Sequence, residues 1–172
     1  MKLENRSYEL QQITSSDEQL IVLLLLQKRY IEACKLCEQE EDSVQNFFNK
    51  GIAYYYCQGY ELALSCFKEA LSSIAHLLGD SSESMLSKEN IEKHFYNKER
   101  EDVETLCMQG VTRLYVNHFT EITRFYLLCN ILMCMEKLEM WAEIDTLSST
   151  MYGKQKISFV QKLLAKSNAE KQ

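Results

Sequence analysis

Apolar side chains recur at intervals of three and four residues through most of this chain, which is the period of an amphipathic α-helix. The spacing predicts helices over residues 16–27 and 30–41, and a further pair on either side of a turn at Gln58-Gly59. Pro is absent and Gly occurs only five times, so the residues that usually punctuate strands and tight turns are scarce. We therefore predict an all-α fold.

Residues 44–78 show the most regular alternation of small and large apolar positions. These positions are Phe47, Gly51, Tyr54, Tyr60, Ala63, Phe67 and Ala70. We expect Gly51 and Ala63 to face each other where the two helices approach closely. The pattern resembles a tetratricopeptide (TPR) repeat, a helix–turn–helix unit of about 34 residues. The resemblance implies a short right-handed solenoid that binds other proteins and carries no chemistry.

Two weaker copies of the unit flank this one. Residues 14–41 are predicted to form a degenerate first repeat, because Tyr30-x2-Ala33-x3-Cys37 has the spacing of Tyr60-x2-Ala63-x3-Phe67. Residues 103–138 are predicted to form a degenerate third repeat, with Gly110 in the place of Gly51. The polar residues 79–101 between them are interpreted as an insertion.

The last part of the chain, residues 139–170, is predicted to hold terminal helices. The apolar face that ends at Leu138 belongs to a helix that begins near Thr120, and a shorter helix follows from Trp141. Residues 154–166 form an amphipathic final helix that is suited to cap a helical stack, since such a stack needs one polar outer face. We expect residues 1–172 to form a single domain.

Composition and charge favour a protein partner. The formal net charge is −6, from 19 Lys plus Arg against 25 Asp plus Glu, so no basic surface for nucleic acid or an anionic membrane is expected. The apolar run 20–26 is far shorter than the roughly 20 residues that cross a bilayer. Its flanking charges also have the reverse order of a secretory signal. An intracellular, reducing location in the cytoplasm or nucleus is therefore expected.

The seven cysteines do not form a recognisable metal or redox motif. Cys34-x2-Cys37 is the one CxxC pair, whereas a structural zinc site needs a second pair or a pair of histidines. His76, His94 and His118 are scattered, and no glycine-rich phosphate-binding motif is present. We therefore expect reduced thiols, no metal, no cofactor and no enzymatic activity.

In the TPR family the first helix of each repeat lines a concave groove, and the resemblance places that groove here on ten residues. They are Val22, Leu25, Leu26, Phe48, Ile52, Tyr55, Tyr56, Val111, Leu114 and Tyr115. This lining is apolar and rich in tyrosine. TPR proteins that bind the carboxyl-terminal tails of chaperones carry a Lys and Asn clamp, but the corresponding positions here are Phe48 and Ile52. A chaperone-tail function is therefore not expected.

An apolar groove of this size has two physical explanations. It can hold a helix or an extended apolar segment of a partner protein, or it can be filled by the later helices of the same chain. We expect an adaptor or scaffold subunit that binds such a segment, within a hetero-complex. The alternatives are a structural subunit that uses its outer helical surface in a stable assembly, and a homo-oligomer.

Overall fold

The computed structural model of the chain describes residues 16–78, 103–151 and 158–170. All regular secondary structure in these residues is helical, so the all-α prediction is confirmed for them. The predicted insertion at 79–101 lies outside the described residues. The proposed start of the last helix, at residues 154–157, lies outside them as well.

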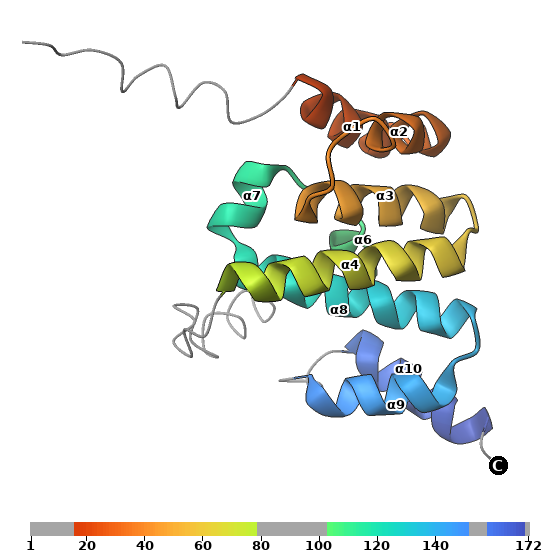
Figure 1. The fold of residues 1–172 in the computed structure, drawn as a ribbon. Helices are drawn as coiled ribbons and strands as arrows, with labels where there is room; N and C mark the ends of the chain where they lie inside the picture. The colour runs from red at the N-terminus through yellow and green to blue at the C-terminus, as the bar shows by residue number, and fades with distance from the viewer. Residues whose placement is uncertain (1–15, 79–102, 152–157, 171–172) are drawn as a thin grey trace, which may run out of the picture.

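Nine helices are present in the described part of the chain. They are α1 (Ser16–Leu26), α2 (Tyr30–Cys37), α3 (Val44–Tyr56), α4 (Tyr60–Leu78), α6 (Val103–Cys107), α7 (Arg113–His118), α8 (Thr120–Lys137), α9 (Trp141–Thr150) and α10 (Ser158–Glu170). Seven of them stack in the order α1, α2, α3, α4, α8, α9, α10, each against the next (Figure 1). The short helices α6 and α7 lie beside this stack and contact α8.

Three helical hairpins close through the same kind of turn. The turns contain one residue each with positive φ, namely Lys28 (61°), Gln58 (64°) and Glu139 (57°). In every case the N–H of the following residue bonds to the carbonyl five residues before it, at 2.8 or 2.9 Å, which is the Schellman ending of a helix. An aromatic residue then begins the next helix: Tyr30, Tyr60 or Trp141. The pairs α1–α2, α3–α4 and α8–α9 are therefore equivalent hairpins.

The close contact within the second hairpin involves the ring of Phe67. A Cβ atom on Gly51 would lie only 2.6–2.8 Å from three carbons of this ring. The ring is fully buried and meets Phe48 edge-on, with 6.0 Å between the ring centroids. Gly51 and Ala63 are both buried, and the closest contact at Gly51 is with Phe67, one turn after Ala63 on α4. That Gly51 and Ala63 face each other stays a prediction.

The third hairpin has a different register from the predicted repeat at 103–138. Gly110 lies in the loop between α6 and α7, whereas Gly51 lies inside α3. A Cβ atom on Gly110 would lie 2.9 Å from Cδ1 of Leu25 and 3.4 Å from the Cα of Val22, so this glycine allows a loop to press against α1. Helix α8 then runs without a break to the turn at Glu139.

Helix α2 ends at Cys37, four residues before the predicted end. The residues that follow it include four carboxylates between Glu38 and Asp42, and negative charge is unfavourable at the carboxyl end of a helix. The side-chain amide of Asn46 donates hydrogen bonds to the carbonyl oxygens of Cys37 (3.0 Å) and Glu41 (3.1 Å). These bonds hold the non-helical turn against the start of α3.

Candidate functional site

The inner side of the hairpin stack is occupied by the chain's own residues 107–113, which we call the inner segment. Its backbone is held by one polar side chain from each of the first helices of the three hairpins. The amide of Asn49 on α3 donates to the Val111 carbonyl at 2.8 Å, and its oxygen accepts from the Val111 N–H at 2.8 Å. Asn130 on α8 donates to the Cys107 carbonyl at 2.9 Å, and Glu18 on α1 accepts from the Arg113 N–H.

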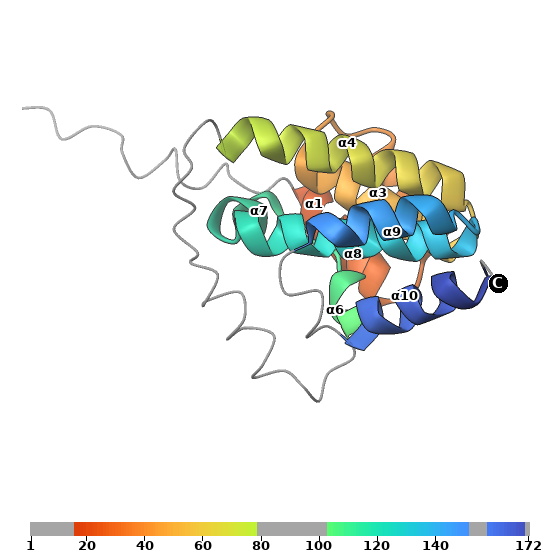
Figure 2. The ribbon, with the colours of Figure 1, turned by 90° about the horizontal axis from the view of Figure 1, so that it is seen from below.

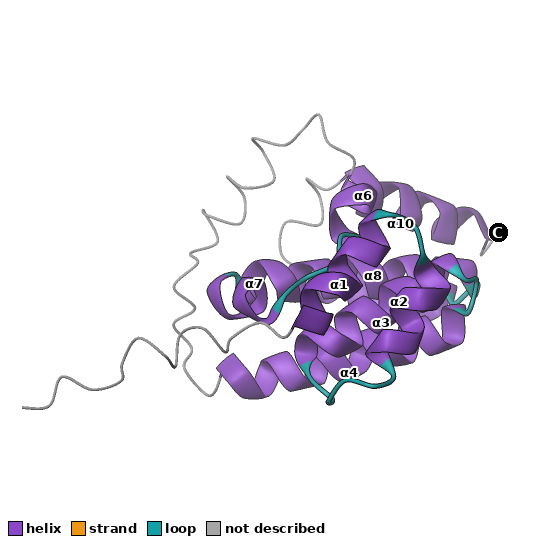
Figure 3. Ribbon diagram, turned by 90° about the horizontal axis from the view of Figure 1, so that it is seen from above, coloured by secondary structure: helices purple, strands orange, loops and turns teal. Residues whose placement is uncertain are grey.

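The inner segment belongs to the core of the protein. Asn49, Asn130, Cys107 and Val111 are all buried, with at most 4% of their surface exposed. Helix α6 packs against α8, and seen from above it lies on the side of the stack away from α4 (Figure 3). From below, α6 and α10 lie on that same side (Figure 2). The link between the second and third hairpins therefore packs against the first helix of each hairpin at this position.

The buried carboxyl of Glu18 makes the fold sensitive to pH. Burial raises the pKa of Glu18, and the hydrogen bond from Arg113 offsets only part of this rise. The folded chain therefore holds this proton more tightly than the unfolded chain, so stability from this group is lost as the pH rises through the folded pKa. Glu18→Gln keeps an acceptor for Arg113 and should raise the melting temperature by a few degrees at about pH 7.5, with little change at about pH 4. A lower melting temperature of the variant at about pH 7.5 would contradict this assignment.

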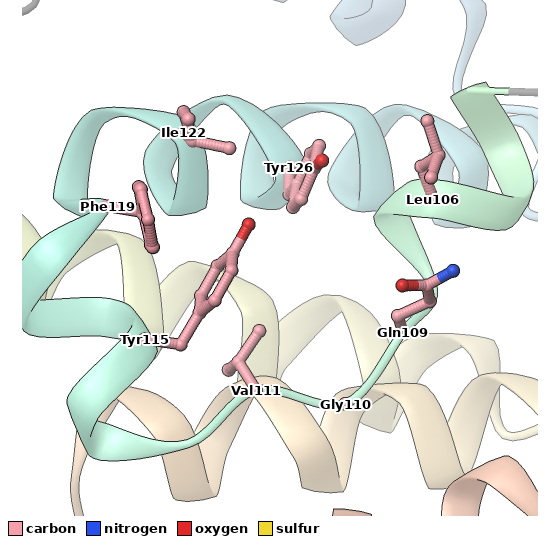
Figure 4. Close-up of a pocket in the computed structure, with 8 residues that line it drawn as sticks. All are labelled: Leu106, Gln109, Gly110, Val111, Tyr115, Phe119, Ile122 and Tyr126. Atoms are coloured by element: carbon pink, nitrogen blue, oxygen red, sulfur yellow. The ribbon is translucent and has the colours of Figure 1, made fainter. Parts of the chain in front are cut away.

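A hollow of about 300 Å³ remains open between the inner segment, α7 and α8 (Figure 4). We call it the α7–α8 hollow. Its lining residues are Leu106, Gln109, Gly110, Val111, Tyr115, Phe119, Ile122 and Tyr126. Phe119 stands at its edge with 44% of its surface exposed, and its ring lies 5.0 Å from that of Tyr115. The hollow is thus accessible from outside.

The walls of the α7–α8 hollow carry no charge at neutral pH. None of the lining residues has a carboxylate, ammonium or guanidinium group. Burial raises the pKa of both Tyr115 and Tyr126. They therefore stay neutral, and the hollow suits an uncharged apolar group better than an ion.

The ten predicted groove residues differ in exposure: some are buried, some are half-buried and some are exposed. Leu25, Phe48 and Ile52 are buried within the chain, with at most 6% exposed, and Val22 is half-buried where Gly110 approaches it. The residues at the surface lie on three different helices: Leu26, Tyr56 and Leu114. Tyr56 stacks on Tyr30 with 4.4 Å between the ring centroids, whereas Tyr55 is half-buried and lies edge-on to Tyr60.

Val111 and Tyr115 are the two predicted groove residues that line the α7–α8 hollow. The sequence interpretation missed the three residues that hold the inner segment, although two of them follow a pattern. Asn49 lies nine residues before Gln58, and Asn130 lies nine residues before Glu139, so both occupy the same place in equivalent helices. A polar amide within an apolar helix face was the available signal, since a buried amide needs a hydrogen-bonding partner.

Burial suppresses the reactivity of three cysteine thiols, those of Cys37, Cys66 and Cys134. It raises the pKa of Cys37 and Cys134 to about 12 and that of Cys66 to about 11. These thiols are therefore protonated at neutral pH and are weak nucleophiles. Within the described ranges, no group of three or more His, Cys, Asp or Glu residues is placed to hold a metal ion. No helix in those ranges has the length and apolar character needed to span a bilayer.

Comparisons with protein-family models, curated proteins and solved structures found no match to this chain. The resemblance to TPR repeats therefore rests on the sequence spacing alone. What the protein does has to follow from the surfaces that the chain itself presents.

Proposed function

We propose that this chain is a non-enzymatic protein-interaction module of TPR-like helical repeats, an adaptor or scaffold subunit of the cytoplasm or nucleus. The α7–α8 hollow is the observation that carries the proposal, because the inner segment fills the neighbouring part of the inner face. An uncharged hollow with an exposed aromatic edge is the kind of surface that binds an apolar anchor of another protein.

The dimensions of the hollow suit one large side chain of a partner. A dry cavity of about 150 Å³ holds a benzene ring, and this hollow has about twice that volume. Gln109 is exposed at its edge and offers both a donor and an acceptor to a partner's backbone. The expected ligand is therefore a helix or an extended segment that inserts one aromatic or large aliphatic side chain.

Selection from a displayed library of random peptides tests this function. The enriched peptides should share one aromatic or large aliphatic anchor and should bind with dissociation constants in the micromolar range, roughly 1–100 μM. Phe119→Lys places a charge at the edge of the hollow and should weaken binding about tenfold or more. Leu62→Lys is the matched control, since Leu62 on α4 is also exposed (55%) and does not line the hollow.

Two outcomes would contradict the proposed function. One is that selection on the unmodified protein enriches no peptide beyond those that a parallel selection on the Phe119→Lys protein enriches. The other is that the enriched peptides bind Phe119→Lys and the unmodified protein equally well. Circular dichroism of each variant establishes that the helical content is unchanged, so that a loss of binding reports on the hollow.

A structural role through the outer surface is the second candidate. One observation favours it: α1 exposes three leucines on the side away from the core. That surface is separate from the α7–α8 hollow, and the two roles are compatible.

A further inference from the structure

Helix α1 is apolar on the side that faces away from the protein. Residues 20–26 contain no polar side chain, although a helix at the surface normally carries one polar face. Ile21, Leu24 and Leu25 are buried in the core. The outward residues are Leu20 (41% exposed), Leu23 (48%) and Leu26 (65%), and we call them the leucine face. A helix that is apolar all round is normally buried on both sides.

Comparison of the three hairpins shows what should cover this face. Leu23 lies five residues before the turn residue Lys28, and Ala53 and Cys134 have the same offset from Gln58 and Glu139. Both Ala53 and Cys134 are fully buried, in helices that pack against the hairpin before them: α3 against α2, and α8 against α4. Leu23 therefore occupies a position where the other two hairpins receive a helix.

The charges at the ends of α1 fit a second α1 running in the opposite direction. Asp17 lies in the first turn and Lys28 follows the last turn, and both are exposed. Leu23 lies at the middle of the leucine face. In an antiparallel pair centred on Leu23, Leu20 lies beside Leu26 of the second copy, and Asp17 lies opposite Arg29 and next to Lys28 of the second copy. The charges at the two ends of the face are thus complementary to those of a second copy.

The other end of the stack makes a head-to-tail contact unfavourable. Helix α10 closes that end, and its exposed residues include Gln161, Lys162, Lys166 and Asn168. A polar surface of this kind offers no counterpart to three leucines. Self-association through the leucine face therefore ends with a closed pair, as an isologous two-fold contact does. We propose that α1 pairs antiparallel with α1 of a second copy, about a two-fold axis at Leu23.

Sedimentation of the full chain between about 5 and 500 μM tests the pair. The leucine face is small, so we expect a dimer with a dissociation constant of roughly 10–100 μM. Leu23→Glu puts two carboxylates at the axis and should leave a folded monomer over the whole concentration range. Leu62→Glu introduces the same charge at an exposed leucine on α4 and should leave the dimer intact.

Exchange of the charges tests the antiparallel arrangement. Asp17→Lys alone places like charges together at both ends of the pair and should weaken the dimer about tenfold. Asp17→Lys combined with Lys28→Asp should recover part of the lost affinity, because a carboxylate then lies next to the new ammonium group while Arg29 stays in place. An unmodified chain that is monomeric at about 500 μM would overturn the proposal, and so would a Leu23→Glu dimer. A double variant that dimerises no better than Asp17→Lys alone would overturn the antiparallel register and indicate another occupant of the face.

Discussion

Replacing Asn49 with leucine should destabilise the protein by about 2–5 kcal/mol. The side chain of Asn49 satisfies both the N–H and the C=O of Val111, at 2.8 Å each, and both residues are buried. Leucine has a similar volume but no hydrogen-bonding atom, so two buried backbone groups lose their partners. Each such group costs about 1–3 kcal/mol when it is left unsatisfied.

Urea unfolding followed by circular dichroism measures this effect. Asn117→Leu is the matched control, because Asn117 is exposed on α7 and the same substitution there should change the free energy of unfolding by less than about 0.5 kcal/mol. A loss of less than about 1 kcal/mol for Asn49→Leu would show that Asn49 does not hold the inner segment.

Replacing Gly51 with leucine should cost about 1–3 kcal/mol. Even a Cβ atom at this position would come within 2.6 Å of the Phe67 ring, and that ring is fully buried against Phe48. Leucine is a better helix former than glycine by about 1 kcal/mol, but this gain is smaller than the cost of overpacking. The steric conflict therefore determines the sign of the effect.

A double-mutant cycle assigns this loss to one contact. Phe67→Ala alone should cost about 3–5 kcal/mol, because it leaves a cavity in the core. In the Phe67→Ala background, the space left by the ring can accept the new leucine, so Gly51→Leu should cost far less than in the original protein. Additive losses would mean that Gly51 makes room for another group.

The helical periodicity of the sequence predicted the main elements well. The paired helices on either side of Gln58-Gly59 end and begin within two residues of the predicted limits, and α8 begins at Thr120 as expected. These elements are set by local preferences: an apolar face with a period of 3.6 residues, and a turn that needs positive φ. Such signals lie within the segment that they shape, so the sequence alone reveals them.

The inner segment could not be predicted in the same way. Gly110 stands in a spacing that resembles the repeat, but a glycine can serve a close approach in a loop as well as in a helix. The partner of Asn49 lies 62 residues away along the chain, and no periodic pattern connects two positions so far apart. The contact depends on how the three hairpins stack. The spacing of residues within one segment of the sequence does not show how separate hairpins pack.

The same reason explains the mixed result for the predicted groove. Val111 and Tyr115 line the α7–α8 hollow, whereas Phe48 and Ile52 are fully buried. Helical spacing identifies the residues that share one face of a helix, but it does not show what covers that face. Here the chain supplies part of the cover itself, and the proposed partner site is the part that remains open.

Amide hydrogen exchange at Val111 tests the central claim most directly, namely that the chain fills its own groove and leaves the α7–α8 hollow for a partner. The N–H of Val111 lies in a loop but donates to the buried side chain of Asn49. We predict that it exchanges at least about 10³ times more slowly than in an unstructured peptide, and about as slowly as the amides of Ile131 and Leu132 in the core of α8. Addition of a selected peptide should keep or increase this protection, because the peptide binds the folded state. Exchange of the Val111 amide at the rate of an open loop would show that the inner segment leaves the groove, and would contradict the account.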